Sequence, residues 1–311
     1  MTLRSYVIAA LTALLMPGLA LAQGASWGDT PAGDAPPKLK VVASFSILAD
    51  FVRRVGGDRI ELTTLVGPDG DAHVYAPTPA DARRIGDAKV VFVNGLGLEG
   101  WIGRLVKAAA GRSTVVEAAR GVARVEAAGE PGHSHGGADP HAWQNVANAR
   151  IYVANIRDAL NVADPAGRAA YDANAAAYLA ELDALDAEVR AAIARIPADR
   201  RRIITSHDAF AYFEKAYGID FVAPQGVSTE AEASARDVAR IIQQIRRERI
   251  RAVFVENISD PRLVERIARE TGARIGDRLY SDALSGPGGP AATYIDMIRH
   301  NIRAFSTALS S

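Results

Sequence analysis

The chain has 311 residues, with 36 Lys and Arg against 36 Asp and Glu, and it contains no cysteine. This length allows two domains of ordinary size, each with its own core. The even charge balance gives no reason to expect nucleic acid or an acidic membrane surface as a partner. Without cysteine, we expect neither disulfides nor a lipid anchor attached through a cysteine.

The N-terminus has the pattern of a secretory signal peptide. Arg4 supplies a positive charge, residues 7–20 form a short apolar stretch, and Ala20-Leu21-Ala22 is a small-residue cleavage site. The pattern predicts that residues 1–22 are removed and that the mature chain is a soluble periplasmic protein. The alternative is an uncleaved N-terminal anchor. Residues 23–38 are rich in Gly, Pro and Ala, which predicts a disordered tail.

Short apolar runs alternate with helical segments from residue 39 onward. Strands are expected at 41–45, 60–66, 89–93 and 113–118. Helices are expected at 47–55, at 79–85 with Thr78 as the cap and Pro79 in the first turn, at 101–110 and at about 145–160. Strands that alternate with helices indicate a parallel sheet covered on both faces. Residues 39–163 therefore form the expected N-terminal lobe.

One long helix is expected next, within residues 164–197. Asp164 is the expected cap and Pro165 suits the first turn. A helix over residues 165–196 would be about 48 Å long. An apolar stripe at helical spacing predicts that it packs along both lobes, although a coiled-coil arm is the alternative. The stripe consists of Tyr171, Tyr178, Leu182, Leu185, Val189 and Ile193.

The alternation of strands and helices resumes in residues 198–311. Strands are expected at 202–205, 220–222, 251–255 and 274–279, and helices at 209–217, 234–247, 261–271 and 291–309. The predicted fold class is α/β, with two lobes that each contain a parallel sheet flanked by helices. One long rigid helix joins the two lobes.

Four loop residues have the chemistry of a metal site. His73, His141, His207 and Asp282 offer three imidazoles and one carboxylate, the ligand set of a closed tetrahedral site for a metal such as zinc. Three of them follow a predicted strand, where ligands of parallel sheets bind. They are far apart in the sequence, so only a large fold could assemble them. The expected site lies in the cleft between the lobes.

Each of these residues also has a more ordinary interpretation. A single loop histidine is usually a surface residue, and Asp282 alone could be a helix cap or a turn residue. His300, in the last predicted helix, has no acidic or histidine neighbour in the sequence and is expected at an exposed helix position. His133 and His135 form an H-x-H pair in a Gly-rich loop that could bind metal weakly or be ordinary polar sequence.

Four motifs together resemble the metal-specific substrate-binding proteins of ABC transporters, the zinc/manganese family. The resemblance covers about residue 39 to the C-terminus. It implies two α/β lobes bridged by one helix, the ligands His73, His141, His207 and Asp282, and delivery of the ion to a membrane permease driven by a cytoplasmic ATPase. The motifs are Gly70-x-x-His73-x-Tyr75-x-Pro77-Thr78-Pro79, Asp139-Pro140-His141-x-Trp143, Thr205-Ser206-His207-Asp208-Ala209-Phe210-x-Tyr212 and Tyr280-Ser281-Asp282-Ala283-Leu284.

The third ligand position helps to predict the metal. Manganese-type members of the family often carry Glu there, whereas this chain has His207. Three imidazoles favour Zn2+ over Mn2+ as the transported ion. Zinc members often have a long His-rich loop before the second ligand, but here that loop holds only His133 and His135. These two residues are interpreted as an auxiliary landing point, in a monomer that a periplasmic metallochaperone could load.

Two other classes of function remain as alternatives. A zinc-dependent hydrolase would need an open coordination position and a general base. Glu99 and Glu256 are candidate bases, but they belong to no recognisable catalytic motif, and four protein ligands would close the site. An adhesin is the third hypothesis, which the lack of repeats disfavours. The predicted function is therefore non-enzymatic capture of a divalent metal, zinc above all, with manganese or mixed specificity as the alternative.

Overall fold

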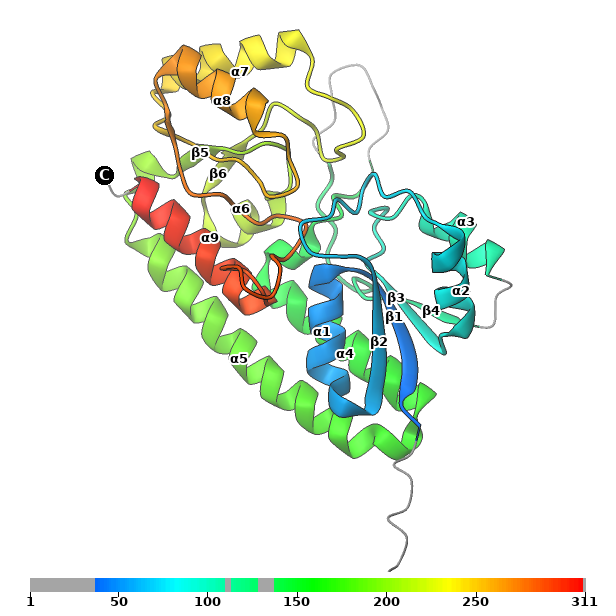
Figure 1. Ribbon diagram of the computed structural model, residues 1–311. Helices are drawn as coiled ribbons and strands as arrows, with labels where there is room; N and C mark the ends of the chain where they lie inside the picture. Colours follow the sequence, from blue (N-terminus) through cyan, green and yellow to red (C-terminus); the bar gives the residue numbers. More distant parts are fainter. Residues whose placement is uncertain (1–36, 110–112, 128–136, 310–311) are drawn as a thin grey trace, which may run out of the picture. The chain divides into compact units, whose positions relative to one another are not determined.

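Two parallel four-stranded sheets form the framework of the computed structural model, which describes residues 37–109, 113–127 and 137–309 (Figure 1). The predicted signal peptide, residues 1–22, and nearly all of the predicted tail lie outside the described residues. Within the described ranges, no helix has the length and apolar character needed to cross a membrane. Residues Lys38–Ser311 make up one compact unit by their contacts.

The first sheet has the strand order β2-β1-β3-β4. Its strands are β1 (Leu39–Phe45), β2 (Ile60–Val66), β3 (Val90–Val93) and β4 (Thr114–Glu117). The register pairs Leu39 with Ile60 and Val41 with Val90. All four residues of β3 are buried, as expected for a central strand covered on both faces. The four strands predicted from the sequence in this region are all present.

Four helices accompany this sheet: α1 (Ser46–Gly56), α2 (Pro79–Asp87), α3 (Ile102–Ala108) and α4 (Val146–Ala163). The predicted start of α2 is confirmed. The Thr78 hydroxyl accepts a hydrogen bond from the Asp81 N–H (3.4 Å), and the Asp81 carboxylate accepts one from the Thr78 N–H (2.8 Å). This reciprocal cap fixes the point where the long loop after β2 ends.

The long helix is α5 (Arg168–Ala194), preceded by a 3₁₀ turn at Pro165–Gly167. Its 27 residues correspond to about 40 Å, less than the predicted length. Asp164 stands at the cap position of this turn with Pro165 after it, as predicted, but its side chain makes no capping hydrogen bond. The Asp164 carboxylate instead accepts hydrogen bonds from the Arg59 guanidinium (2.8 Å) and the Tyr171 hydroxyl (2.8 Å). It therefore ties the start of the helix to the first sheet.

The predicted apolar stripe of α5 is entirely buried. The helix packs against α1 and α4 and against the C-terminal helix α9 (Tyr294–Leu309), as Figure 1 shows. Ion pairs join its outer face to the same neighbours, Arg299 to Glu188 (2.8 Å) and Arg54 to Glu181. These contacts exclude the coiled-coil arm and leave a helix that serves both sheets.

The second sheet repeats the strand order of the first, as β6-β5-β7-β8. Its strands are β5 (Arg202–Ile204), β6 (Asp220–Val222), β7 (Ala252–Val253) and β8 (Arg274–Ile275). The helices α6 (Ala211–Tyr217), α7 (Ala235–Glu248), α8 (Pro261–Thr271) and α9 accompany it. This arrangement confirms the predicted fold class of two parallel sheets flanked by helices. The exact boundaries predicted for the two lobes, 39–163 and 198–311, stay a prediction.

The last two strands are shorter than the sequence predicted for 251–255 and 274–279. Regular pairing ends after Ile275, although the Gly276 N–H still donates to the Val253 carbonyl (2.9 Å). Gly276 also passes against the Phe254 ring, where an added Cβ would lie 2.3 Å from a ring carbon. Pairing resumes when the Leu279 N–H donates to the Val255 carbonyl (2.9 Å). The interruption ends the regular strand well before Asp282, which therefore stands on a loop and not directly at a strand end.

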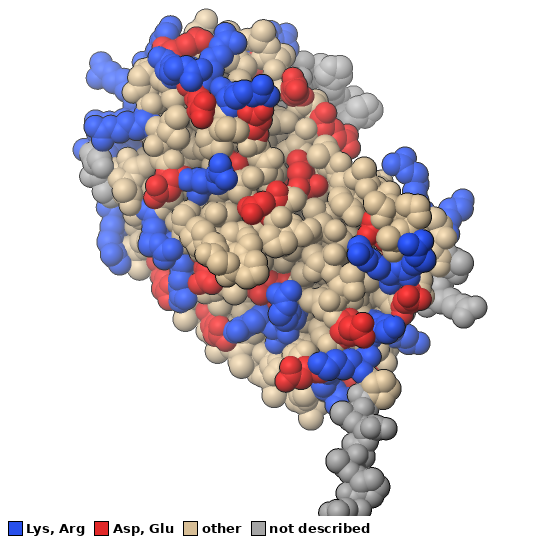
Figure 2. All heavy atoms as spheres, viewed as in Figure 1, with Lys and Arg blue, Asp and Glu red and all other residues tan. Residues whose placement is uncertain are grey.

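Charged side chains cover the outside of the second sheet's helices. Figure 2 shows basic side chains gathered over α7 and α8. Several are paired within their own helix, as in Arg266 with Glu270 (2.9 Å) and Arg240 with Asp237 (3.5 Å). Such pairs between exposed side chains add little to stability and are typical of a solvated face.

Candidate metal centre

The structure brings His73, His141, His207 and Asp282 together. One ligand-capable atom from each lies within 4.8 Å of the others, and all four residues are buried. The Asp282 Oδ2 lies 3.0 Å from His73 Nε2, 3.4 Å from His141 Nε2 and 3.3 Å from His207 Nε2. Three Nε2 atoms and one carboxylate oxygen thus converge on one small volume and could together hold a metal ion.

His73 stands on the loop between β2 and α2. The Asp71 carboxylate accepts a hydrogen bond from the His73 N–H (2.8 Å), which fixes the turn. The Trp101 indole N–H donates to the Ala72 carbonyl (2.8 Å) and holds the loop against α3. The two contacts position the backbone at His73 and leave its Nε2 directed at Asp282.

His141 is held by the carboxylate two residues before it. One Asp139 oxygen accepts a hydrogen bond from the His141 N–H (2.8 Å) and lies 2.8 Å from His141 Nδ1. A carboxylate on Nδ1 orients an imidazole so that Nε2 is free to bind metal. Asn94, just after β3, donates to the Pro140 carbonyl (2.9 Å) and connects this loop to the first sheet.

His207 follows β5 and depends on a residue far away in the sequence. One Glu256 oxygen accepts hydrogen bonds from the N–H groups of Ser206 (2.7 Å) and His207 (2.9 Å). The other oxygen lies 2.6 Å from His207 Nδ1. Glu256 is completely buried and engaged with this turn on both oxygens. Both oxygens thus lie against the turn that carries His207, which is the position of a support for His207.

Asp282 is positioned by two neighbouring segments. The Trp143 indole N–H (2.9 Å) and the Gln144 amide (2.8 Å) both donate to the Ser281 carbonyl. On the other side, Asn301 in α9 exchanges two hydrogen bonds with the backbone of Tyr280 (3.1 and 2.7 Å). The sequence analysis did not identify Gln144 or Asn301, and Trp143 appeared there only as part of a motif.

Electrostatic interactions among these groups shift their protonation strongly. Burial raises the pKa of Asp282, but the neighbouring His141 and His207 outweigh it and hold that pKa well below its usual range. Burial lowers the pKa of His141, but Asp282 and Asp139 outweigh it and raise the pKa to about 9. Burial also lowers the pKa of His207, but Glu256 and Asp282 outweigh burial and raise this pKa well above its usual value. The cluster therefore favours positive charge, from protons or from a metal ion.

The other candidate residues are His133, His135, His300 and Glu99. His133 and His135 lie outside the described residues. His300 is half-buried and not fully exposed as expected, because its Nε2 contacts the Arg278 carbonyl (2.8 Å) and its ring packs on Tyr280. The buried Glu99 accepts hydrogen bonds from the Ser44 hydroxyl (2.6 Å) and the Asn94 N–H (2.6 Å). Glu99, the other candidate base, is thus also committed to the framework.

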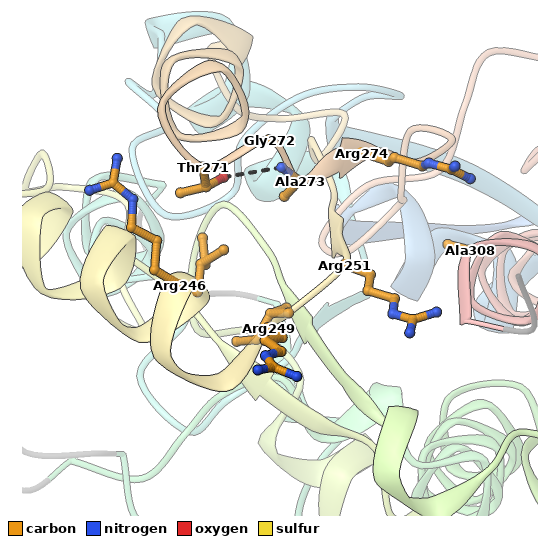
Figure 3. A pocket seen from close by; sticks show the side chains of 10 residues that line it. Arg246, Arg249, Arg251, Thr271, Gly272, Ala273, Arg274 and Ala308 are labelled. Atoms are coloured by element: carbon orange, nitrogen blue, oxygen red, sulfur yellow. Dashed lines mark hydrogen bonds between the residues drawn. The ribbon is translucent and has the colours of Figure 1, made fainter.

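A surface hollow between α7, α8 and α9 has a different character (Figure 3). Four arginines line it together with apolar residues, and no histidine or carboxylate does. Their guanidinium groups point in different directions in Figure 3 and do not converge on one point. This hollow therefore offers no metal ligands. The arginines are Arg246, Arg249, Arg251 and Arg274.

Residues 41–308 match the model of the family described as zinc-uptake complex component A, periplasmic (ZnuA). The chain is 35% identical over 290 residues to the manganese-binding lipoprotein MntA of Halalkalibacterium halodurans, covering 93% of this chain and 95% of that protein. It is 33% identical over 278 residues to the iron-binding protein YfeA of Yersinia pestis, covering 89% and 88%.

A solved structure gives the same result for the fold. The periplasmic zinc binding protein TroA from Treponema pallidum matches with a TM-score of 0.83 at 32% identity, covering 88% of this chain and 99% of that chain. The names of these three proteins agree on metal binding but differ in the metal, which is manganese, iron or zinc.

Proposed function

The chain belongs to the ZnuA family of metal-binding components of ABC transporters, and from this premise we propose that it captures zinc in the periplasm for import. As a substrate-binding component it is not an enzyme, and it works with a membrane permease and an ATPase. The observation that supports zinc is the donor set. Three imidazole nitrogens and one carboxylate oxygen converge within 4.8 Å in a buried site.

This donor set suits zinc better than manganese for two reasons. Zinc accepts a closed tetrahedral shell of nitrogen and oxygen ligands at about 2.0–2.2 Å. Manganese prefers a larger number of oxygen ligands and stands below zinc in the affinity order for divalent ions. Only one of the four converging residues, Asp282, supplies oxygen. We therefore place zinc first among the ions that the site would select.

A manganese or mixed-specificity binder is the second candidate. The relative MntA, which spans nearly the whole chain, is named as manganese-binding. The two candidates differ at one position, because replacing His207 by Glu would give the site a second carboxylate. The choice of metal is thus open to a direct test.

The test is metal analysis of the protein purified from periplasm, followed by competition between equal amounts of zinc and manganese. We expect zinc in the purified protein and a preference for zinc of at least about tenfold. The variant H207E should lose much of that preference, whereas H300E, the same exchange outside the cluster, should keep it. Manganese in the purified protein, with zinc unable to displace it, would contradict the zinc assignment.

Three further parts of the proposal concern the export of the protein, its oligomeric state and the loading of zinc. We propose that the protein reaches the periplasm through its N-terminal signal sequence and acts there as a monomer. His133 and His135, on the loop just before His141, would form a transient landing point for zinc delivered by a metallochaperone. Two imidazoles alone cannot complete a tetrahedral zinc shell, so the ion would pass on to the four-ligand site.

A further inference from the structure

A hollow on the protein surface lies beside two of the four ligand loops. It has a volume of about 480 Å³, and its lining includes Asp71, Ser206, Gln225 and Thr229. Ser206 precedes His207, and Asp71 accepts the hydrogen bond from the His73 N–H. This hollow therefore adjoins the backbone that carries His73 and His207. No residue of the four ligand loops lines the hollow of Figure 3.

One irregular segment, residues 225–231, lies along this hollow and joins the two ligand loops. We call it the gate segment. At its start, Gln225 pairs with His207, and the Gly226 carbonyl accepts a hydrogen bond from the Asp208 N–H (3.2 Å). At its far end, the Thr229 hydroxyl donates to the Asp71 carboxylate (2.6 Å). The gate segment thus spans from the His207 loop to the His73 loop.

The gate segment is held mostly by its own bonds. The Gln225 side-chain amide donates to the carbonyls of Thr229 (3.1 Å) and Ala231 (2.8 Å), so the segment has an internal brace. Among the described residues, the Thr229–Asp71 hydrogen bond is the one hydrogen bond or ion pair that joins it to the first-sheet side of the site. Breaking this single bond would free the part of the segment around Thr229 to swing away, while Gln225 and Gly226 stay joined to the His207 loop.

The opposite side of the His73 loop is tied more firmly to the second sheet's loops. The Asp69 N–H donates to the Leu284 carbonyl (2.9 Å), and the Asn257 amide donates to the Asp69 carboxylate (2.9 Å). His73 also differs from the other two histidines. Within residues 37–109, 113–127 and 137–309, no carboxylate lies against its Nδ1, whereas Asp139 and Glu256 brace the other two. The least braced ligand thus stands next to the single bond.

We propose that the gate segment closes the route by which the metal ion enters and leaves, and that Thr229 is the positioning residue that keeps it closed. This inference rests on the proposed function as a metal-binding protein, but not on the choice of zinc. Because Thr229 contacts Asp71 and no ligand side chain, its role would be to set the rate of exchange. The four ligands would set the affinity.

The test replaces Thr229 by Val, which keeps the shape and removes the hydroxyl. Zinc release to a chromophoric chelator and zinc loading are each followed by stopped flow. We expect both rates to rise about tenfold, the factor that corresponds to one hydrogen bond to a charged group. The ion crosses the same gate in both directions, so the equilibrium affinity should change by less than about threefold.

Two further variants make the result specific. T229S keeps the hydroxyl and should restore the rates of the unmodified protein. T271V makes the same substitution beside the hollow of Figure 3, where Thr271 donates to the Ile267 carbonyl (2.7 Å), and should leave both rates unchanged. Unchanged rates in T229V would overturn the proposal. Faster release with unchanged loading and weaker binding would also overturn it, because Thr229 would then stabilise the bound ion itself.

The gate and the proposed function can fail separately. If the unmodified protein binds manganese but not zinc, the zinc assignment fails, and the same variants test the gate with manganese. If it binds neither ion, the metal-binding function fails. If it binds zinc tightly while T229V exchanges at the normal rate, only the gate fails.

Discussion

The two sheets share one strand order, but only the second has one of the four converging residues, His207, shortly after its first strand in the chain. In both sheets a buried glutamate follows the third strand and reaches back to the end of the first. Glu99 accepts a hydrogen bond from the Ser44 hydroxyl in β1 (2.6 Å), and Glu256 accepts the His207 N–H just after β5 (2.9 Å). The two sheets therefore share a topology and carry a buried glutamate at the corresponding place, but the two glutamates have different contacts.

The difference lies in what the glutamate touches. Glu99 contacts a hydroxyl and backbone N–H groups, and burial raises the pKa of its carboxyl. Glu256 contacts the imidazole of His207 at 2.6 Å as well as the backbone. A buried acid that only braces a turn can be replaced by a neutral amide, whereas one that orients a ligand and raises its basicity cannot. The fold supplies the brace, and the side chain after the first strand decides whether it serves metal binding.

The largest effect should come from removing the ligand itself. His207→Ala takes one of the four donors from the second sheet and should weaken zinc binding by more than about a hundredfold, beyond what loss of a supporting residue costs. Ser44→Ala removes the hydroxyl that Glu99 holds in the first sheet and should leave affinity nearly unchanged. Competition with a chelator of known affinity measures both. Equal losses in the two variants would contradict the division of roles between the sheets.

A smaller effect should separate the two glutamates. Glu256→Gln keeps the shape but replaces the carboxylate on His207 Nδ1, and we expect zinc affinity to fall by about 10–100-fold. Glu99→Gln should leave zinc affinity within a few-fold, because Glu99 accepts hydrogen bonds from the Ser44 hydroxyl and the Asn94 N–H and contacts none of the four converging side chains. The same chelator competition gives both values. A loss in E99Q as large as that in E256Q would show that both braces act on the metal site.

The sequence predicted the framework better than the supports of the site. Local patterns located Pro79 as the start of α2 and the buried stripe of α5, because capping and helical periodicity are properties of neighbouring residues. The resemblance to a known family pointed to His73, His141, His207 and Asp282. The close approach of Gly276 to the Phe254 ring was not predicted, nor was the binding of the Asp164 carboxylate by Arg59. Such contacts link residues that are distant in the sequence.

The third prediction concerns the pH dependence of zinc affinity, to which histidines from the loops of both sheets contribute. An ordinary histidine, with a pKa near ~6.5, would release its proton below neutral pH. His141 keeps its proton up to a pKa of about 9, so zinc must displace that proton at neutral pH. Zinc affinity should therefore still rise between pH 7 and 9, by up to about tenfold per unit for each proton displaced. Calorimetry in buffers of different ionisation enthalpy counts the protons released.

Without metal, the same shift should lower stability as the pH rises. The pKa of His141 in the folded chain lies above its unfolded value, so the stability that it contributes is complete below about pH 6.5. That contribution is lost as the pH rises through about 9. Thermal unfolding in a chelator should thus show a falling Tm from pH 6.5 to 9. A Tm that rises over this range, or zinc binding without proton release at pH 7, would contradict the charged state of the cluster.

The smallest effect should come from a histidine of the second sheet that lies outside the cluster. His300 contacts the Arg278 carbonyl and the ring of Tyr280, close to Asp282 in the sequence. The Asp282 loop, however, keeps its bonds to Asn301, Trp143 and Gln144 when His300 is removed. His300→Ala should therefore change zinc affinity by less than about twofold and cost about 1 kcal/mol of stability, the value of one hydrogen bond.

The matched variant is Asn301→Ala, which removes two bonds to the backbone of Tyr280 from the same face of α9. It leaves buried backbone groups without partners, so it should destabilise the fold more and shift Asp282 enough to weaken zinc binding measurably. Chelator competition and thermal unfolding of both variants rank the two contacts. If H300A weakened zinc binding as much as N301A, the Asp282 loop would be positioned through His300. His300 in α9 would then position Asp282, in the way that Glu256 positions His207.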